Sequence, residues 1–165
     1  LFLCTHNSAR SILAEALLNH LGQGRFKAWS AGSSPRANQQ PHPLGLRALQ
    51  QAGVSIQGLH SKSWDVFAQP GAPGMHLIIT VCDNAAGEVC PIWPGRPITA
   101  HWGFADPAAV AGTPEQKRRA FERIFREIMI RVQLFANLPL QTLTRQAIQQ
   151  EMQRIGQSTS GATDS

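Results

Sequence analysis

The chain has 165 residues, of which 42% are hydrophobic and 15% charged, and a formal net charge of +5. This length and composition predict one soluble domain with a single core. No apolar run approaches the roughly 20 residues that a membrane-spanning helix needs. No aromatic and basic motif typical of nucleic-acid binding accompanies the positive charge, so we expect neither a nucleic-acid nor a membrane partner.

The first third of the chain predicts a strand, a helix and a second strand. Residues 1–4 form a short apolar strand whose first residues precede Leu1, and they are too few to be a signal peptide. Gly22 and Gly24 end the helix that follows. Residues 26–29 are expected to form the second strand. The apolar face of the helix carries Ile12, Leu13, Ala16, Leu17 and Leu21.

The middle of the chain continues this alternation. Pro41 and Pro43 open a second helix, which Gly53 closes. Residues 75–81 form an apolar, β-branched run typical of a central parallel strand. Residues 97–102 are a further candidate strand.

The last third predicts two helices. Thr113, Pro114 and Gln116 form a capping box at the start of a long helix, which Pro139 ends. A final helix reaches about Ile155. The apolar stripe of the long helix consists of Phe121, Ile124, Phe125, Ile128, Val132 and Phe135. Its arginines, among them Arg118, Arg119, Arg123 and Arg126, are expected to solvate the exposed face, although an anionic substrate or acidic partner could also use the charge.

These elements predict one α/β domain over residues 1–155, with an open parallel sheet flanked by helices on both faces. The Ser/Thr/Gly-rich residues 156–165 are expected to be a disordered tail. There is no internal repeat. Three cysteines in a chain without a secretion signal argue against a disulfide framework and for a cytoplasmic protein with buried, metal-bound or catalytic thiols.

The segment from Cys4 to Ser11 places a cysteine and an arginine six residues apart between a strand and a helix. Ligand sites of open α/β sheets occur at such a turn. Backbone N–H groups there can surround an oxyanion, Arg10 can bind it through two hydrogen bonds, and Ser11 can donate to the sulfur. The same field is expected to lower the pKa of Cys4. The expected oxyanion-binding residues are Thr5, His6, Asn7, Ser8, Ala9 and Arg10.

Other interpretations of this segment remain open. Cys4 could be a buried residue that ends a strand, with Arg10 on the surface. A zinc site with Cys4 and His6 is a weaker alternative, because no paired C-x-x-C motif supports it.

Cys82 and Cys90 form a second group, which begins at the end of the predicted central strand. If the segment between them were helical, the two would lie roughly 12 Å apart along its axis. A disulfide needs Cα atoms within about 7 Å, so the pair can be oxidised only if the segment bends or unwinds. A zinc site with His101, or two unrelated buried cysteines, are the alternatives.

Asp106 and Pro107 follow the last predicted strand. An aspartate fixed by a proline in such a loop suits a general acid near a leaving oxygen. Asp-Pro is equally common as the start of a turn.

The residues from Cys4 to Ser11 resemble the signature loop of low-molecular-weight tyrosine phosphatases and their arsenate reductase relatives. Ala9 stands where the phosphatases usually have a second cysteine, so the loop is more similar to the reductases. The cysteine pair and the segment from His101 to Ala108 match the same pattern. The resemblance therefore covers about residues 1–108.

This resemblance implies a reaction with arsenate. Cys4 attacks arsenic and Asp106 protonates the departing hydroxyl. Cys82 then attacks Cys4 with release of arsenite, and Cys90 attacks Cys82. The final disulfide is reduced by thioredoxin or by glutaredoxin with glutathione. No tightly bound cofactor and no metal are expected.

The sequence departs from the family pattern in two places. Seven residues separate Cys82 from Cys90, one more than in the best-known thioredoxin-coupled members. Asn7, Glu15 and Ser30 match positions that bind potassium in some relatives. The Thr and Asp expected later in that site are replaced by Ser61 and Ser63, so we expect Asn7 and Glu15 to hold the loop by hydrogen bonds instead.

Two other functions are compatible with the residues. A tyrosine phosphatase could use the same loop and Asp106. However, Ala108 stands where family phosphatases usually have an aromatic residue, and the cysteine pair has no role in that reaction. A sensor that binds a metalloid through three thiols is the second alternative, and it would not need Asp106.

Overall fold

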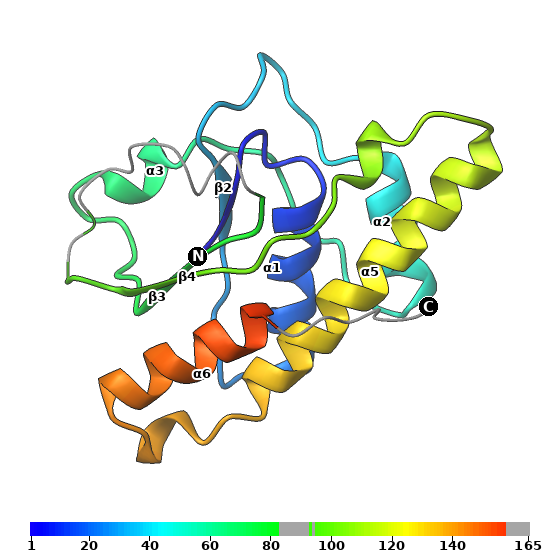
Figure 1. Cartoon of the computed structure of the whole chain (residues 1–165). Helices are drawn as coiled ribbons and strands as arrows, with labels where there is room; N and C mark the ends of the chain where they lie inside the picture. Colours follow the sequence, from blue (N-terminus) through cyan, green and yellow to red (C-terminus); the bar gives the residue numbers. More distant parts are fainter. Residues whose placement is uncertain (83–92, 94, 158–165) are drawn as a thin grey trace.

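The computed structural model describes residues 1–82, 93 and 95–157, and its centre is a four-stranded sheet (Figure 1). The strand order is β2-β1-β3-β4, and every neighbouring pair is parallel. Each pair of parallel neighbours requires a crossover, which the intervening segments supply. The strands are β1 (Phe2–Cys4), β2 (Ser30–Gly32), β3 (Leu77–Thr80) and β4 (Ile98–His101).

Helices of very different length cover the two faces of this sheet. Figure 1 shows α3 on one side and α1, α5 and α6 on the other. The helices are α1 (Arg10–Leu21), α2 (Pro43–Gln51), α3 (Asp65–Ala68), α5 (Pro114–Ala136) and α6 (Arg145–Gln157), with 3-10 turns η1 (Pro107–Ala109) and η2 (Leu140–Thr142). The predicted α/β fold with helices on both faces is therefore confirmed.

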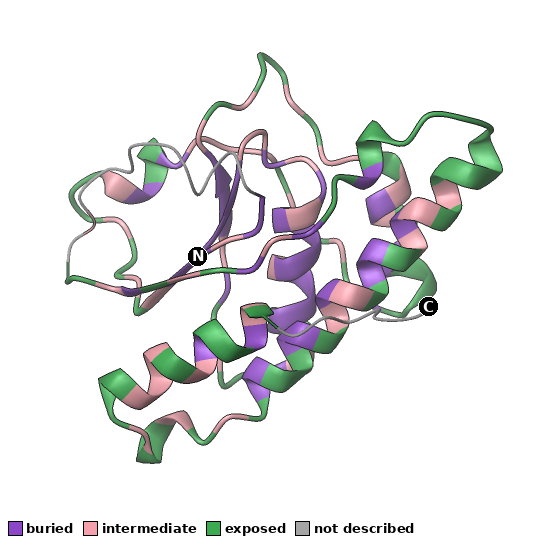
Figure 2. Cartoon of the chain, in the orientation of Figure 1, coloured by how far each residue is buried: buried purple, intermediate pink, exposed green. Residues whose placement is uncertain are grey.

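Alternation along β1 divides the core into two clusters. Phe2 and Cys4 face the larger cluster beneath α1, α5 and α6, whereas Leu3 faces a smaller one with Trp64 and Phe67 beside α3. This division follows from the two-residue period of a strand. In Figure 2 the buried residues accordingly concentrate on the strands, on α1 and on the inner face of α5.

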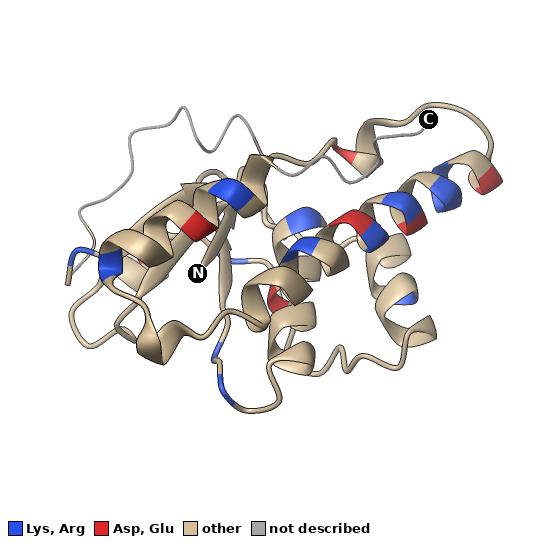
Figure 3. Ribbon diagram, turned by 60° about the horizontal axis from the view of Figure 1, so that its bottom comes forward, with Lys and Arg blue, Asp and Glu red and all other residues tan. Residues whose placement is uncertain are grey.

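The long helix α5 is built as its sequence predicts. Thr113 Oγ1 accepts from the Gln116 backbone N–H at 3.1 Å, and Gln116 Oε1 accepts from the Thr113 N–H at 2.8 Å, which completes the capping box. All six residues of the predicted apolar stripe are buried. On the outer face, Arg118, Arg119 and Arg123 pair with glutamates of the same helix. Figure 3 shows these charges alternating along the helix, which supports the solvating role predicted for most of the arginines.

Two element boundaries differ from the prediction. The second strand is Ser30–Gly32, and residues 26–29 precede it, although the Trp29 carbonyl still accepts from the Phe2 N–H of β1 at 2.9 Å. The aromatic residues of 26–29 favour a strand, but the small residues after them are the ones that pair with β1. The last helix continues through Gln157, so Gly156 and Gln157 are helical and not part of a tail. Residues 158–165 of the predicted tail lie outside the described residues.

No helix in the described part of the chain is long and apolar enough to cross a bilayer.

Candidate active site

Cys4 and Cys82 lie at the same edge of the sheet, at the carboxyl ends of the neighbouring strands β1 and β3. The loop from Cys4 leads directly into α1, which begins at Arg10. A pocket of about 470 Å³ opens over this loop. Its lining residues are Cys4, Thr5, His6, Asn7, Ser8, Ala9, Arg10, Arg36, Gln39, His42, Asp106, Ala108 and Ala109. The structure thus brings all the predicted oxyanion-binding residues to one cavity.

Asn7 fixes the shape of the loop. Its backbone is left-handed, with φ of 55°, and its side chain is fully buried. Its Nδ2 donates to Ser11 Oγ at 2.8 Å and to Ser30 Oγ at 2.9 Å, and its Oδ1 accepts from the Lys62 N–H at 2.9 Å. These three bonds offset the strain of the left-handed conformation. The prediction that Asn7 holds the loop by hydrogen bonds is confirmed.

Gly32, at the end of β2, permits the loop to lie close to the sheet. A Cβ at this position would lie 2.7 Å from the Thr5 carbonyl oxygen and 3.0 Å from the Asn7 nitrogen. The next two residues donate backbone hydrogen bonds to the loop, from Ser33 to the Cys4 carbonyl at 3.0 Å and from Ser34 to the Thr5 carbonyl at 2.8 Å. Backbone hydrogen bonds therefore hold the loop against the end of β2.

Arg10 connects the loop to the segment that carries Asp106. Its Nη1 donates to the Phe104 carbonyl at 2.9 Å, and its Nη2 lies 3.7 Å from Asp106 Oδ2. Asp106 Oδ1 accepts from the Ala108 N–H at 3.0 Å, which caps the short turn η1. The Asp106 side chain is 43% exposed and opens into the pocket. Asp106 therefore opens a turn and also lines the pocket, so the two interpretations are compatible, and its role as a general acid stays a prediction.

Cys4 and Cys82 are both buried with free thiols, and the Cys82 sulfur lies 3.5 Å from the hydroxyl of Thr5, the residue after Cys4. The hydrogen bond with Cys82 and burial raise the pKa of Cys4 above its usual value, while Arg10 and the Thr5 N–H act in the opposite direction. The expected net lowering of the pKa of Cys4 is therefore wrong. Arg10 does favour the thiolate as expected, but a second thiol beside the sulfur outweighs it.

A partly buried polar network lies behind the loop, where the family resemblance suggested potassium ligands. Ser30 Oγ donates to Glu15 Oε1 at 2.5 Å, so the hydroxyl joins Glu15 to Asn7. The Lys62 ammonium lies 4.0 Å from Glu15 Oε1 and donates to the Ser30 carbonyl at 2.9 Å. The network thus contains a lysine cation beside the matched residues, which agrees with the prediction that Glu15 helps to hold the loop.

Three residues of the long loop before α2 complete the pocket, and none of them was predicted from the sequence. They are Arg36, Gln39 and His42. His42 donates its backbone N–H to the Ser8 carbonyl at 3.0 Å, and its Nδ1 accepts from the Leu44 N–H at 3.2 Å. Burial lowers the pKa of His42, which Asp106 partly opposes. The position of His42 directly before the helix-opening Pro43 was the available signal.

The other predicted site residues are placed as follows. Ser11 is buried and accepts from Asn7, so its predicted bond to the Cys4 sulfur stays a prediction. His6 Nδ1 bonds to the Ser34 carbonyl, and His101 Nδ1 to the Thr80 hydroxyl. Within residues 1–82, 93 and 95–157 no group of three metal-ligating side chains occurs. Cys90 and its predicted bend lie outside the described residues.

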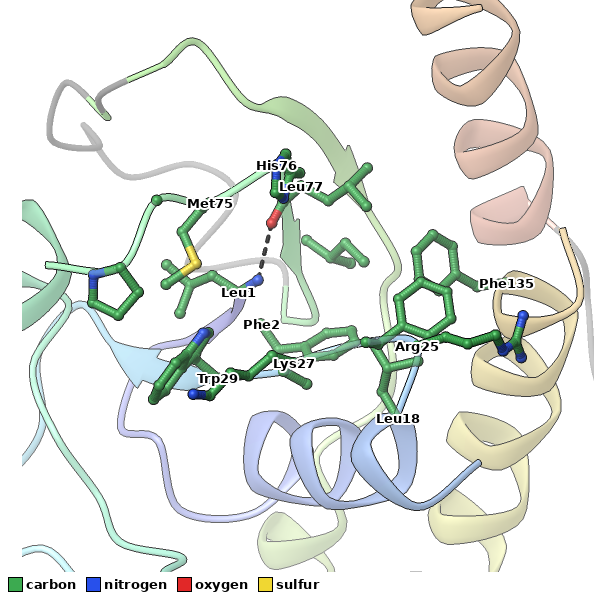
Figure 4. A pocket seen from close by; sticks show the side chains of 15 residues that line it. Leu1, Phe2, Leu18, Arg25, Lys27, Trp29, Met75, His76, Leu77 and Phe135 are labelled. Carbon is green, nitrogen blue, oxygen red and sulfur yellow. Dashed lines mark hydrogen bonds between the residues drawn. The ribbon is translucent and has the colours of Figure 1, made fainter. Parts of the chain in front are cut away.

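A second hollow, of about 390 Å³, lies at the amino ends of β1 and β3 (Figure 4). The Leu1 ammonium donates there to the Leu77 carbonyl at 2.9 Å. The lining of this hollow contains no cysteine or carboxylate. It consists of apolar residues together with Arg25, Lys27 and His76. Because open α/β sheets bind ligands at the carboxyl ends of their strands, the pocket over Cys4 is the better candidate for chemistry.

Comparison with known proteins gives one family for almost the whole chain. The family described as low molecular weight phosphotyrosine protein phosphatase matches residues 1–153. The arsenate reductase of Bacillus licheniformis is 36% identical over 136 residues, which cover 82% of this chain and 92% of the relative. The arsenate reductase of Bacillus subtilis is 34% identical, with the same coverage of both chains.

Solved structures agree in fold. An arsenate reductase from Archaeoglobus fulgidus is 26% identical with a TM-score of 0.63, over 83% of this chain and 98% of that one. A thioredoxin-dependent arsenate reductase from Corynebacterium glutamicum is 28% identical with a TM-score of 0.53, over 81% of this chain and 60% of that one. The tyrosine phosphatase Wzb from Escherichia coli K30, at 19% identity and a TM-score of 0.64, shares the fold.

Proposed function

Since the chain belongs to the low-molecular-weight phosphotyrosine protein phosphatase family and is similar to its arsenate reductases, we propose that it reduces arsenate to arsenite at Cys4. The observation that carries the proposal is the position of Cys82 beside the Cys4 loop, where its Sγ lies 3.5 Å from the hydroxyl of Thr5, the residue after Cys4, and where its thiol raises the pKa of Cys4. A phosphatase needs one nucleophilic sulfur. A reductase needs a second thiol within reach of the first, because two electrons must pass to arsenic.

In the first step, arsenate binds over the loop amides and Arg10, and the Cys4 sulfur attacks arsenic. The thiol proton of Cys4 passes to the bound oxyanion and from it to the Asp106 carboxylate. Asp106, in the same pocket, protonates the departing hydroxyl, which leaves as water. The product is a Cys4–arsenic(V) adduct.

In the second step, the Cys82 thiolate attacks the Cys4 sulfur. The sulfur–arsenic bond breaks, its electron pair reduces arsenic(V) to arsenic(III), and arsenite leaves. Cys90 then displaces Cys4 from the Cys4–Cys82 disulfide. A dithiol of the thioredoxin type reduces the resulting Cys82–Cys90 disulfide, as the named dependence of the Corynebacterium relative suggests; glutaredoxin with glutathione is the alternative. A reducing cytoplasm suits a cycle that begins with three free thiols.

The pocket wall favours a small inorganic oxyanion over an aryl phosphate. Ala108 and Ala109 line the side next to Asp106, and neither offers a ring that could stack on a tyrosine side chain. Weak phosphatase activity at Cys4 is compatible with this wall, but it gives Cys82 no role.

Arsenate-dependent turnover with a thioredoxin system tests the proposal, in the intact protein and in Cys82→Ser and Cys90→Ser. Loss of turnover in both variants, with Cys4 still reactive toward arsenate, is the expected result. Full turnover in either variant would disprove the three-thiol relay and would favour glutathione-coupled reduction or phosphatase chemistry at Cys4.

A further inference from the structure

Lys62 has an unusual environment for a lysine. Its side chain is only 13% exposed, and its ammonium donates to the Ser30 carbonyl at 2.9 Å and to the His60 carbonyl at 2.8 Å. The Glu15 carboxylate, 14% exposed, lies 4.0 Å away. Three oxygen atoms from separate parts of the chain therefore converge on one ammonium group.

Both charges of this pair are costly to bury. Burial lowers the pKa of Lys62 and raises the pKa of Glu15, and each group partly offsets the shift of the other. Removal of one member of a buried pair leaves the other uncompensated and is strongly destabilising. A lysine with only a solvating role lies exposed at the surface, so the burial of Lys62 beside a carboxylate indicates a structural role.

Lys62 is connected to the loop that carries Cys4 by two sets of hydrogen bonds. Its backbone N–H donates directly to Asn7 Oδ1 at 2.9 Å. Its ammonium binds the carbonyl of Ser30, whose hydroxyl lies between Glu15 and Asn7 Nδ2. Asn7 has the left-handed backbone conformation in the loop. A displacement of Ser30 would therefore displace Asn7 and, with it, the backbone N–H groups that line the pocket.

We propose that Lys62 is a positioning residue of the oxyanion site, with its ammonium serving as an internal cation that keeps the loop in its anion-binding shape. Without the ammonium, the Ser30 and His60 carbonyls and the Glu15 carboxylate face one another with no donor between them. Ser30 then moves, and Asn7 Nδ2 loses one of its two hydrogen-bond acceptors. The inference rests on the proposed binding of the oxyanion over Cys4.

The test measures the affinity of the full chain for inorganic phosphate, used as an unreactive analogue of arsenate, by titration calorimetry. Lys62→Met removes the ammonium and keeps most of the apolar stem. We expect phosphate binding about 10- to 100-fold weaker, since small displacements of positioned groups have effects of this size. Lys27→Met is the matched control, because the Lys27 ammonium lies over the Trp29 ring at 5.1 Å, outside this network.

Chemical rescue separates a cation role from a merely structural one. Ammonium chloride should restore part of the phosphate affinity of Lys62→Met, whereas tetramethylammonium chloride at equal ionic strength should not, because it is too large and donates no hydrogen bond. Unchanged affinity in a folded Lys62→Met variant, or weakened affinity that ammonium does not restore, would overturn the inference.

If Lys62→Met does not fold, the double variant Lys62→Met/Glu15→Gln removes the uncompensated carboxylate and is measured instead. Weak phosphate binding by the folded double variant supports the inference, and binding equal to that of the intact protein overturns it. Absence of phosphate binding by the intact protein would contradict the proposed function itself, so the two failures are distinguishable.

Discussion

The Arg10 guanidinium lies 3.7 Å from the Asp106 carboxylate and is anchored to the same segment by its bond to the Phe104 carbonyl. One cation thus reaches the loop that binds the oxyanion and the residue that would protonate the leaving group. The Asp106 carboxylate is 43% exposed, and it is held at the pocket by Arg10 and by the Ala108 N–H, which donates to its Oδ1.

Asp106→Asn should lower kcat for arsenate by about 100-fold or more, because general acid catalysis typically contributes 10²- to 10⁴-fold. The amide can still accept the Ala108 N–H, so η1 should keep its shape. Single-turnover formation of the Cys4–arsenic adduct measures the effect. A rate within a few-fold of the intact protein would show that Asp106 is only a turn residue.

Cys82→Ala should shift the ionisation of Cys4 to lower pH. The hydrogen bond with Cys82 is the largest contribution that raises the pKa of Cys4, and its removal leaves Arg10 and the Thr5 N–H to favour the thiolate. The rate of iodoacetamide alkylation of Cys4 as a function of pH reports the change. Arg10→Gln should shift the profile to higher pH, because it removes a contribution that lowers the pKa. A profile that stays in place in both variants would contradict this account of the thiol pair.

Gly32→Ala should damage the site more than it damages the fold. The added Cβ would meet backbone atoms of Thr5 and Asn7, which cannot turn away as a side chain could. We expect destabilisation of about 1–3 kcal/mol in denaturant unfolding, typical of overpacking, and a marked loss of phosphate affinity.

Gly45→Ala is the control for this substitution. Its Cβ would lie 3.8 Å or more from its neighbours, in ordinary contact, and alanine favours the helical conformation of α2. Unfolding and phosphate binding should remain near those of the intact protein. Equal loss of phosphate affinity in both variants would show that the close approach at Gly32 has no special role.

Thr113→Ala should destabilise the protein by about 1 kcal/mol without changing turnover. The substitution removes the side-chain acceptor of the Gln116 N–H at the start of α5. Thermal unfolding together with arsenate turnover checks both parts, and an activity loss beyond that caused by unfolding would mean that the helix start influences the pocket.

The sequence predicted those features that local signals determine. The capping box at Thr113 and the apolar stripe of α5 depend on residues three or four positions apart, and both were correct. Cys4 and Arg10 were placed at the ligand edge of the sheet because a strand and a helix flank them in sequence.

The features that were missed depend on contacts between distant segments. Lys62 lies at the site because the segment after α2 pairs with Gly32. The hydrophobic pattern of the sequence does not predict that pairing. Arg131 is the buried arginine of α5. It donates to the Gly103 carbonyl and stacks on Phe104, whereas Arg118, Arg119 and Arg123 lie on the outer face of the helix. The raised pKa of Cys4 likewise requires the position of Cys82, 78 residues away in the chain.

The most direct test of the central claim is a single turnover of Cys90→Ser with arsenate in the absence of an external reductant. If Cys82 is the thiol that attacks Cys4, each chain should release about one arsenite, and peptide mapping should find a Cys4–Cys82 disulfide. Absence of arsenite release, or release with both thiols still free, would contradict the claim that arsenic receives its electrons from Cys4 and Cys82.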